Sequence, residues 1–242
     1  MSAVSDKFEK DVAEEINKVP GIEAKRPSVG TEYSDVNITK FKNKNVDEWV
    51  EVKMSHTDNL ANPRVFYKNG KWQTTYKTPA AEATVNILND SPQAKKFIDD
   101  ISKYTGIPKK SIKIPTTKGG LKEEGAVPLE IMRRYFDQPG VNRYIANEEN
   151  TDLGELVTEH YTEGKKEPAY YMQAGDDFYR ISKKNPLKLN EKIPLLKGKG
   201  DFKVRVATRS EFYEVQAEIK IKDMPKSNFS IKPKTNKTNP FI

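Results

Sequence analysis

Apolar residues recur along the chain with two different periods, and these periods predict where the helices and strands lie. Phe8, Val12 and Ile16 are spaced four residues apart, which is typical of an amphipathic helix. Thr78 and Ser91 have side chains that cap helices, and each precedes a helical pattern. The sequence therefore predicts helices over residues 5–18, 79–90 and 91–106, followed by two or three helices within 127–164.

Strand periodicity dominates elsewhere. Val36 and Ile38 alternate with polar residues, and a few positions later Val50 and Val52 do the same, so a hairpin is predicted from residues 34–41 and 48–54. A second hairpin is predicted over 64–77 because its centre, Asn69-Gly70, is a strong hairpin turn signal. Residues 168–222 are aromatic and β-branched with turn residues between, which predicts an antiparallel sheet. Residues 223–242 are rich in Lys, Pro, Ser, Asn and Thr, which predicts a flexible basic tail.

Composition narrows the classes of function. The chain has 242 residues, no cysteine and two histidines, so disulfides, thiolate metal sites and multi-histidine zinc sites are excluded. Charged residues make up 32% and apolar residues 35%, and no apolar run is long enough to cross a membrane. No secretory pattern opens the chain, so we expect a cytoplasmic protein without a membrane partner.

Positive charge is concentrated at the C-terminal end of the sequence. The net charge is +7, whereas residues 180–242 alone carry 16 Lys or Arg against 6 Asp or Glu, a balance of +10. A basic surface is the electrostatic footprint of nucleic-acid binding, although a solvated lysine-rich surface without a partner has the same composition. DNA is therefore the expected partner.

Two carboxylates and an amine stand out in the first predicted hairpin. Asp35 and Glu51 lie in its two strands, and Lys53 shares a strand face with Glu51 because residues two apart point to the same side. Two neighbouring carboxylates repel each other unless a cation lies between them. Oxygen ligands favour Mg²⁺ or Mn²⁺, and such an ion beside an amine can promote phosphodiester hydrolysis. The alternative is that Asp35 caps a turn while Glu51 and Lys53 form a solvated pair.

The run "SDV" at 34–36 followed by "EVK" at 51–53 resembles the PD-(D/E)xK (restriction-endonuclease-like) nuclease superfamily. Serine stands where the family name has proline, whereas "EVK" fits fully. The resemblance implies that Asp35 and Glu51 ligate the metal with help from the Val52 carbonyl, and that Lys53 assists the attacking water. The family also places a glutamate on the preceding helix, and of Glu9, Glu14 and Glu15 we prefer Glu9 for this role, with Glu15 second.

Five further side chains are candidates for DNA contacts. Gln73 follows the catalytic strand at a position where related nucleases often have a polar residue that contacts the scissile phosphate. Arg64 lies in the loop that borders the predicted site. In the C-terminal region basic and aromatic residues interleave, which suits phosphate contacts and base stacking; the candidates there are Lys203, Arg205 and Arg209.

The predicted fold class is α/β, with a restriction-endonuclease-like αβββαβ core followed by an α+β C-terminal domain that contains an antiparallel sheet. The predicted boundaries are 1–118 for the nuclease core, 119–222 for the second domain and 223–242 for the tail. We expect a Mg²⁺-dependent (or Mn²⁺-dependent) DNA endonuclease of phage or bacterial type, acting in the bacterial host cell if phage-encoded. A homodimer, a non-cutting DNA-binding module and a basic inhibitor or structural protein that docks an acidic partner are alternatives.

Overall fold

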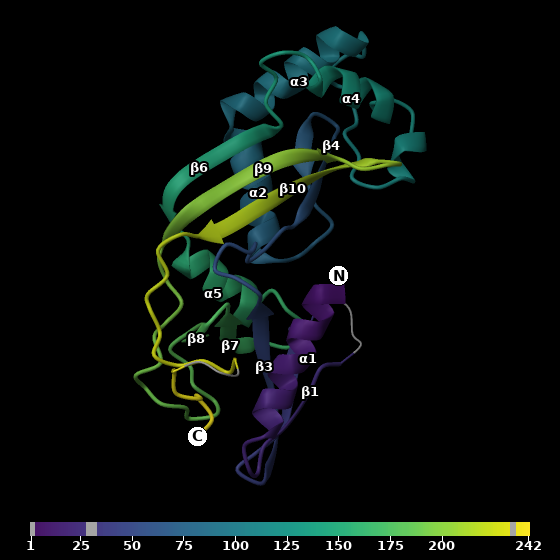
Figure 1. The fold of residues 1–242 in the computed structure, drawn as a ribbon. Coiled ribbons are helices and arrows are strands. Elements are labelled where there is room, and N and C mark those ends of the chain that lie inside the picture. Colours follow the sequence, from purple (N-terminus) through teal and green to yellow (C-terminus); the bar gives the residue numbers. More distant parts are fainter. Residues whose placement is uncertain (1–2, 28–32, 233–235) are drawn as a thin grey trace. The chain divides into compact units, whose positions relative to one another are not determined.

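A computed structural model describes residues 3–27, 33–232 and 236–242. The fold is mixed α/β, and its described part contains five helices and two sheets of five strands each (Figure 1). The helices are α1 Ala3–Asn17, α2 Pro79–Asp90, α3 Pro92–Thr105, α4 Leu129–Phe136 and α5 Gly154–Thr162, with one 3₁₀ turn at Gly120–Lys122. The strands are β1 Glu23–Lys25, β2 Val36–Phe41, β3 Lys44–Lys53, β4 Arg64–Lys68, β5 Lys71–Gln73, β6 Tyr144–Asp152, β7 Ala169–Ala174, β8 Asp177–Arg180, β9 Lys199–Thr208 and β10 Tyr213–Ile221.

The chain divides into two compact units that are not consecutive in sequence. Unit 1 consists of Met1–Leu60, Asp152–Gly200 and Lys220–Ile242, and unit 2 of Ala61–Thr151 and Asp201–Ile219. The structure therefore differs from the predicted division at residues 118 and 222, because the second unit is inserted into the first and does not follow it. The reason is long-range strand pairing, which local periodicity does not reveal.

Unit 1 is built on a sheet with the strand order β1-β2-β3-β7-β8. Its strands are antiparallel to their neighbours except for β3 and β7, which pair in parallel from Trp49 with Ala169 to Lys53 with Ala174. A parallel pair needs a crossover connection, and here α5 completes it just before β7. Strands β7 and β8 thus belong to the sheet of the first hairpin, although the sequence grouped them with β9 and β10.

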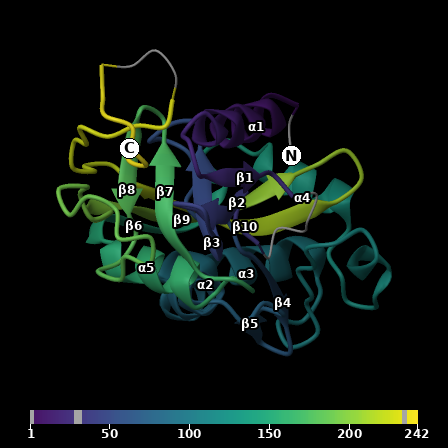
Figure 2. The ribbon, with the colours of Figure 1, turned by 90° about the horizontal axis from the view of Figure 1, so that it is seen from below.

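Helices α1 and α5 cover opposite faces of this sheet (Figure 2). Val12 and Ile16 of α1 pack in one buried cluster with Val50 and Val52 of β3. Tyr161 of α5 instead interacts with the opposite face of β3. The alternation of β3 thus separates an apolar face under α1 from a polar face under α5.

Unit 2 contains most of the second sheet, whose order is β5-β4-β10-β9-β6. Figure 1 shows its long strands β6, β9 and β10 side by side. The predicted turn and cap signals are confirmed: Asn69 and Gly70 have φ of 56° and 78°, as the hairpin turn requires, and Ser91 caps α3 by accepting from the Ala94 N–H at 3.2 Å. Among the described residues, no helix is long and apolar enough to cross a membrane.

The prediction of a flexible tail over residues 223–242 is wrong for its described part. Phe229, Ile231 and Phe241 are buried in the unit 1 core, and the Phe229 carbonyl accepts the Phe178 N–H at 2.9 Å. The tail composition is polar on average, but these few large apolar side chains are enough to anchor it. Phe229 and Ile231 are two residues apart, but Phe241 follows only ten positions later, so the apolar residues are too few to form a recognisable pattern.

The anchoring of this segment can be tested with two neighbouring residues. The Phe241 ring contacts the rings of Phe41 and Phe178, with centroids 6.3 and 5.8 Å away, whereas Ile242 is 90% exposed. We expect Phe241→Ala to lower the free energy of unfolding by about 3 kcal/mol, because it leaves a cavity in the core. Ile242→Ala should change it by less than about 0.5 kcal/mol. Urea unfolding of both variants gives the comparison, and equal stabilities would contradict the packing.

Candidate active site

Strand β3 presents Trp49, Glu51 and Lys53 on its polar face. Glu51 is only 3% exposed, although a carboxylate is rarely buried without a partner. Lys53 supplies that partner, since its Nζ donates to Glu51 Oε1 at 2.6 Å. The predicted same-face arrangement of Glu51 and Lys53 is therefore present, and the alternative of a solvated pair does not hold for a carboxylate this deeply buried.

Asp35 reaches the same place from the position just before β2, the strand next to β3. The β2–β3 ladder ends at the pair Val36–Val50. Beyond it, a side chain replaces the backbone acceptor: Asp35 Oδ2 accepts the Val52 N–H at 2.8 Å. Burial, and then the negative charge of Glu51, raise the pKa of Asp35 to about 7. The structure thus brings together Asp35, Glu51 and Lys53, the three residues that the sequence analysis proposed for the site.

The two carboxylates have opposite protonation behaviour because their surroundings differ. Burial alone would raise the pKa of Glu51, but the positive charges of Lys53 and Lys165 outweigh it and lower that pKa to about 2. Burial likewise opposes the charged form of Lys53, but the negative charge of Glu51 outweighs it and raises the Lys53 pKa well above its ordinary value. Glu51 and Lys53 therefore form an ion pair at neutral pH, while Asp35 lies near the midpoint of its titration.

Lys165, between α5 and β7, is a site residue that the sequence analysis passed over. Its Nζ lies 3.8 Å from Glu51 Oε2 and donates to the Tyr33 carbonyl at 3.3 Å. In the sequence it belongs to a Glu-x-Lys triplet, Glu163–Lys165, which in a lysine-rich chain carries no signal by itself. Only the parallel pairing of β7 with β3 brings Lys165 to Glu51.

Helix α5 adds two more groups that the sequence did not identify. Tyr161 interacts with Lys53, and its hydroxyl donates to the Leu60 carbonyl. Burial, and then the positive charge of Lys165, lower the pKa of His160 to about 4, so this histidine is neutral at physiological pH. The helical pattern predicted a helix in this region, but not which of its faces meets β3.

Of the three glutamates considered on α1, Glu9 is the one that lies near Asp35. It is 4% exposed and adds to the negative charge that Asp35 senses, while Glu14 is exposed and Glu15 pairs with Lys18. Glu9 is already engaged, because its Oε2 accepts from Arg26 Nε at 2.7 Å and its Oε1 from the Ser5 hydroxyl at 2.9 Å. This supports the preference for Glu9 and shows that Arg26 neutralises it.

Several polar atoms around Glu51 are buried without a hydrogen bond in the described chain. They are Glu51 Oε2, the Ser34 hydroxyl, the indole Nε1 of Trp49 and Nδ1 of His160. A buried polar atom without a hydrogen bond is costly, so such atoms point to a missing water, ion or ligand. An unsaturated carboxylate oxygen next to a second carboxylate fits a Mg²⁺ ion that keeps several of its waters. No group of three or more His, Asp or Glu in the described residues could hold a metal ion. The ligands expected here are fewer, Asp35 and Glu51 with the Val52 carbonyl, and waters would have to complete the coordination.

The five predicted DNA contacts all belong to unit 2, and each is already engaged there. Gln73 donates to the Lys68 carbonyl at 2.6 Å across the β4–β5 hairpin. The four basic residues face carboxylates of unit 2: Arg64 Nε lies 2.7 Å from Glu214, Arg205 Nε 2.6 Å from Glu218, Arg209 Nε 2.8 Å from Glu214, and Lys203 Nζ 2.9 Å from Glu149. The expected basic sheet surface is thus a network of ion pairs with little surplus charge.

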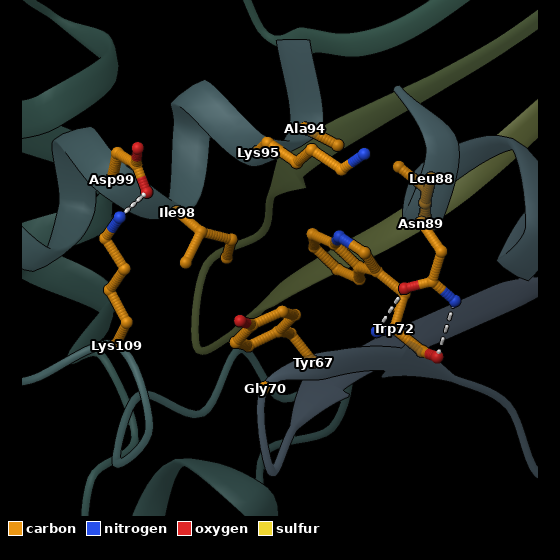
Figure 3. Close-up of a pocket in the computed structure, with 10 residues that line it drawn as sticks. All are labelled: Tyr67, Gly70, Trp72, Leu88, Asn89, Ala94, Lys95, Ile98, Asp99 and Lys109. Atoms are coloured by element: carbon orange, nitrogen blue, oxygen red, sulfur yellow. Dashed lines mark hydrogen bonds and ion pairs between the residues drawn. The ribbon is translucent and has the colours of Figure 1, made fainter. Parts of the chain in front are cut away.

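Unit 2 also has a hollow of about 130 Å³ beside α2 and α3 (Figure 3). The rings of Tyr67 and Trp72 form one wall, with centroids 5.3 Å apart, and Asn89 holds Trp72 by accepting its backbone N–H at 3.0 Å. Its one carboxylate, Asp99, is paired with Lys109. The hollow contains no carboxylate pair, so the cluster around Glu51 is the candidate reaction centre.

The raised pKa of Asp35 predicts that this residue lowers the free energy of unfolding when it is ionised. Its pKa is about 7 in the folded protein against 3.8 ordinarily, so ionisation favours the unfolded chain and stability falls as pH rises from about 4 to 7. We expect Asp35→Asn to raise the free energy of unfolding at pH 8 by about 1–4 kcal/mol without added metal, and by little at pH 4.

Thermal or urea unfolding at the two pH values measures this effect. Asp47→Asn is the control, since Asp47 is an exposed residue of the same hairpin that accepts from Asn37 at 2.6 Å. It should give no pH-dependent gain. A loss of stability in Asp35→Asn at pH 8 would mean that the carboxylate serves as a structural cap and is not held in an unfavourable charged state.

Comparisons with known proteins provide no independent identification of this site. No family model matches the chain, and neither the curated proteins nor the solved structures include a significant match. What can be inferred about function therefore rests on the geometry and charge of the residues around Glu51.

Proposed function

We propose that the protein is a Mg²⁺-dependent endonuclease that hydrolyses phosphodiester bonds in DNA, with a core of the PD-(D/E)xK type. The observation that carries this proposal is the convergence of Asp35 and Glu51, with Lys53 bonded to Glu51 at 2.6 Å. Glu51 lies in β3 and Asp35 directly precedes β2, and the two meet near the end of β3 where Asp35 accepts the Val52 N–H.

The order of elements in unit 1 supports the same proposal. If the inserted unit 2 is set aside, the chain runs α1, β1, β2, β3, α5 and β7, with β3 parallel to β7. This has the αβββαβ order implied by the sequence resemblance, but α5 and β7 stand in place of the later elements predicted within residues 1–118. In that order the central helix is α5, which explains why Tyr161 and Lys165 lie over the polar face of β3.

The residues of the chain have separate tasks in this proposal. Asp35 and Glu51 would hold the metal ion, which when bound lowers the pKa of a coordinated water and polarises the phosphate. Lys53 holds Glu51 in its ionised form and lies where it can orient the attacking water or stabilise charge on the phosphate. Glu9 would orient a water or a second ion from the α1 side, and its negative charge acts on Asp35.

DNA is the proposed substrate because the chain carries a net charge of +7 and a phosphodiester is the anion that this site can hydrolyse. For Arg64, Lys203, Arg205 and Arg209 to contribute, each would have to exchange its carboxylate partner for a phosphate. Such an exchange costs part of the ion-pair energy, so each single substitution among them should weaken DNA binding only modestly.

A plasmid-nicking assay tests the proposal. We expect the wild-type protein to cut DNA with Mg²⁺ and not with EDTA, and Asp35→Ala and Lys53→Met to cut at least about a hundredfold more slowly. The matched control is Lys220→Met, which alters the other Glu-x-Lys triplet of a strand, Glu218–Lys220, and should leave the cutting rate unchanged.

The outcomes separate the classes of function. Cutting that depends on Asp35 and Lys53 supports the nuclease. DNA binding without cutting in any variant would support a non-catalytic DNA-binding module. Neither binding nor cutting, on supercoiled, linear, branched and single-stranded substrates alike, would contradict the proposal and favour a protein that docks an acidic partner.

A further inference from the structure

Lys165 lies beside the candidate metal ligands in a largely buried position. Its side chain is 13% exposed, its Nζ donates to the Tyr33 carbonyl at 3.3 Å, and the same atom lies 5.6 Å from the centre of the Tyr161 ring. At 3.8 Å from Glu51 Oε2, the ammonium group faces the carboxylate oxygen that has no hydrogen bond. This is the oxygen that a metal ion would take.

The charges around Glu51 are unfavourable for binding a divalent cation without its DNA substrate. Lys53 already neutralises Glu51 at 2.6 Å, and Lys165 adds a second positive charge. The other predicted metal ligand, Asp35, adds at most one further negative charge. Glu9 lies on the α1 side, where it is bonded to Arg26, which also pairs with Asp6. The two lysines beside Glu51 therefore already balance the two carboxylates before any metal arrives.

A bound phosphodiester would make the site more favourable for a divalent cation. Each phosphate brings one negative charge, and a phosphate beside Glu51 gives Lys165 an alternative partner. Glu51 Oε2 then faces less positive charge and becomes a better ligand. By linkage, whatever the phosphate contributes to metal affinity the metal contributes equally to phosphate affinity.

We propose that Lys165 is a positioning residue that acts as an internal counter-ion of Glu51, so that the free protein binds divalent metal weakly and the metal binds together with the DNA phosphate. This inference rests on the proposed nuclease function, because it assigns Glu51 to the metal. It adds a property that the nuclease assignment alone does not contain: loss of a site lysine tightens metal binding to the free protein.

The test measures metal binding directly. Mn²⁺ is titrated into free wild-type protein and into Lys165→Met, and the unbound ion is followed by electron paramagnetic resonance. We expect Lys165→Met to bind Mn²⁺ about tenfold more tightly, because one positive charge near the ligand is gone. Lys165→Arg, which keeps the charge, should behave like the wild type. If Lys165→Met is unfolded by circular dichroism, Lys165→Gln takes its place.

Lys166→Met is the matched control. It removes the same charge one residue along, but Lys166 is exposed and lies over the ring of Tyr33 at 5.0 Å, where it faces an aromatic ring and not Glu51. Its Mn²⁺ affinity should equal that of the wild type. A second readout is the affinity of a fluorescent DNA duplex with and without Ca²⁺: the gain from Ca²⁺ should be several-fold larger in the wild type than in Lys165→Met.

The inference and the proposed function fail in distinguishable ways. If the wild type cuts DNA with Mg²⁺ but Lys165→Met binds Mn²⁺ no more tightly than wild type or Lys166→Met, the role of Lys165 is wrong and the nuclease stands. If no variant binds Mn²⁺ with or without DNA and the wild type does not cut, both are wrong. Tighter Mn²⁺ binding in Lys165→Met alone, abolished by adding Glu51→Gln, supports the inference.

Discussion

Glu51 is a carboxylate buried in a sheet, and the surrounding structure is arranged to make that tolerable. An ionised carboxylate placed in a protein interior without partners is too costly to persist. Here Lys53 comes from the same strand and Lys165 from the segment that leads into β7, and together they keep Glu51 ionised. The two lysines supply most of this compensation, and Glu51 Oε2 has no hydrogen-bond partner among the described residues.

The parallel pairing of β3 with β7 makes this arrangement possible. It places α5 over the polar face of β3 and so brings Tyr161 and Lys165 to residues that lie more than a hundred positions earlier in the chain. The larger segment of unit 2, Ala61–Thr151, is inserted in the crossover between the two strands, and its second segment, Asp201–Ile219, follows β8. The insertion leaves the sheet of unit 1 intact, since all five of its strands come from segments on either side of it.

The candidate site and unit 2 differ in how completely their charged side chains are paired. In unit 2 the basic side chains of β9 meet carboxylates of β6 and β10, so each charge has a partner of opposite sign. Around Asp35 the pairing is incomplete, and a carboxylate is held close to another one by a single backbone N–H and by burial. Structures keep such unfavourable groups mainly where function needs them, because stability alone would remove them.

The sequence by itself determined the local elements and the core of the candidate site. The helical spacing of α1, the caps of α2 and α3 and the turn at Asn69-Gly70 all act over a few residues, and the structure contains each of them. The same holds for Asp35, Glu51 and Lys53, because a hairpin fixes which residues of two adjacent strands are neighbours.

Tertiary structure decided everything that depends on contacts between distant segments. The insertion of unit 2, the pairing of β7 with β3, the burial of Phe229 and Phe241 and the arrival of Lys165 at Glu51 have no local pattern that encodes them. Nor could composition show that the basic residues of β9 are neutralised, since charge counts do not say which side chains face one another. Such contacts depend on strand order and on the crossover connection. Local periodicity does not determine either, because the same pattern of apolar residues is compatible with several strand orders.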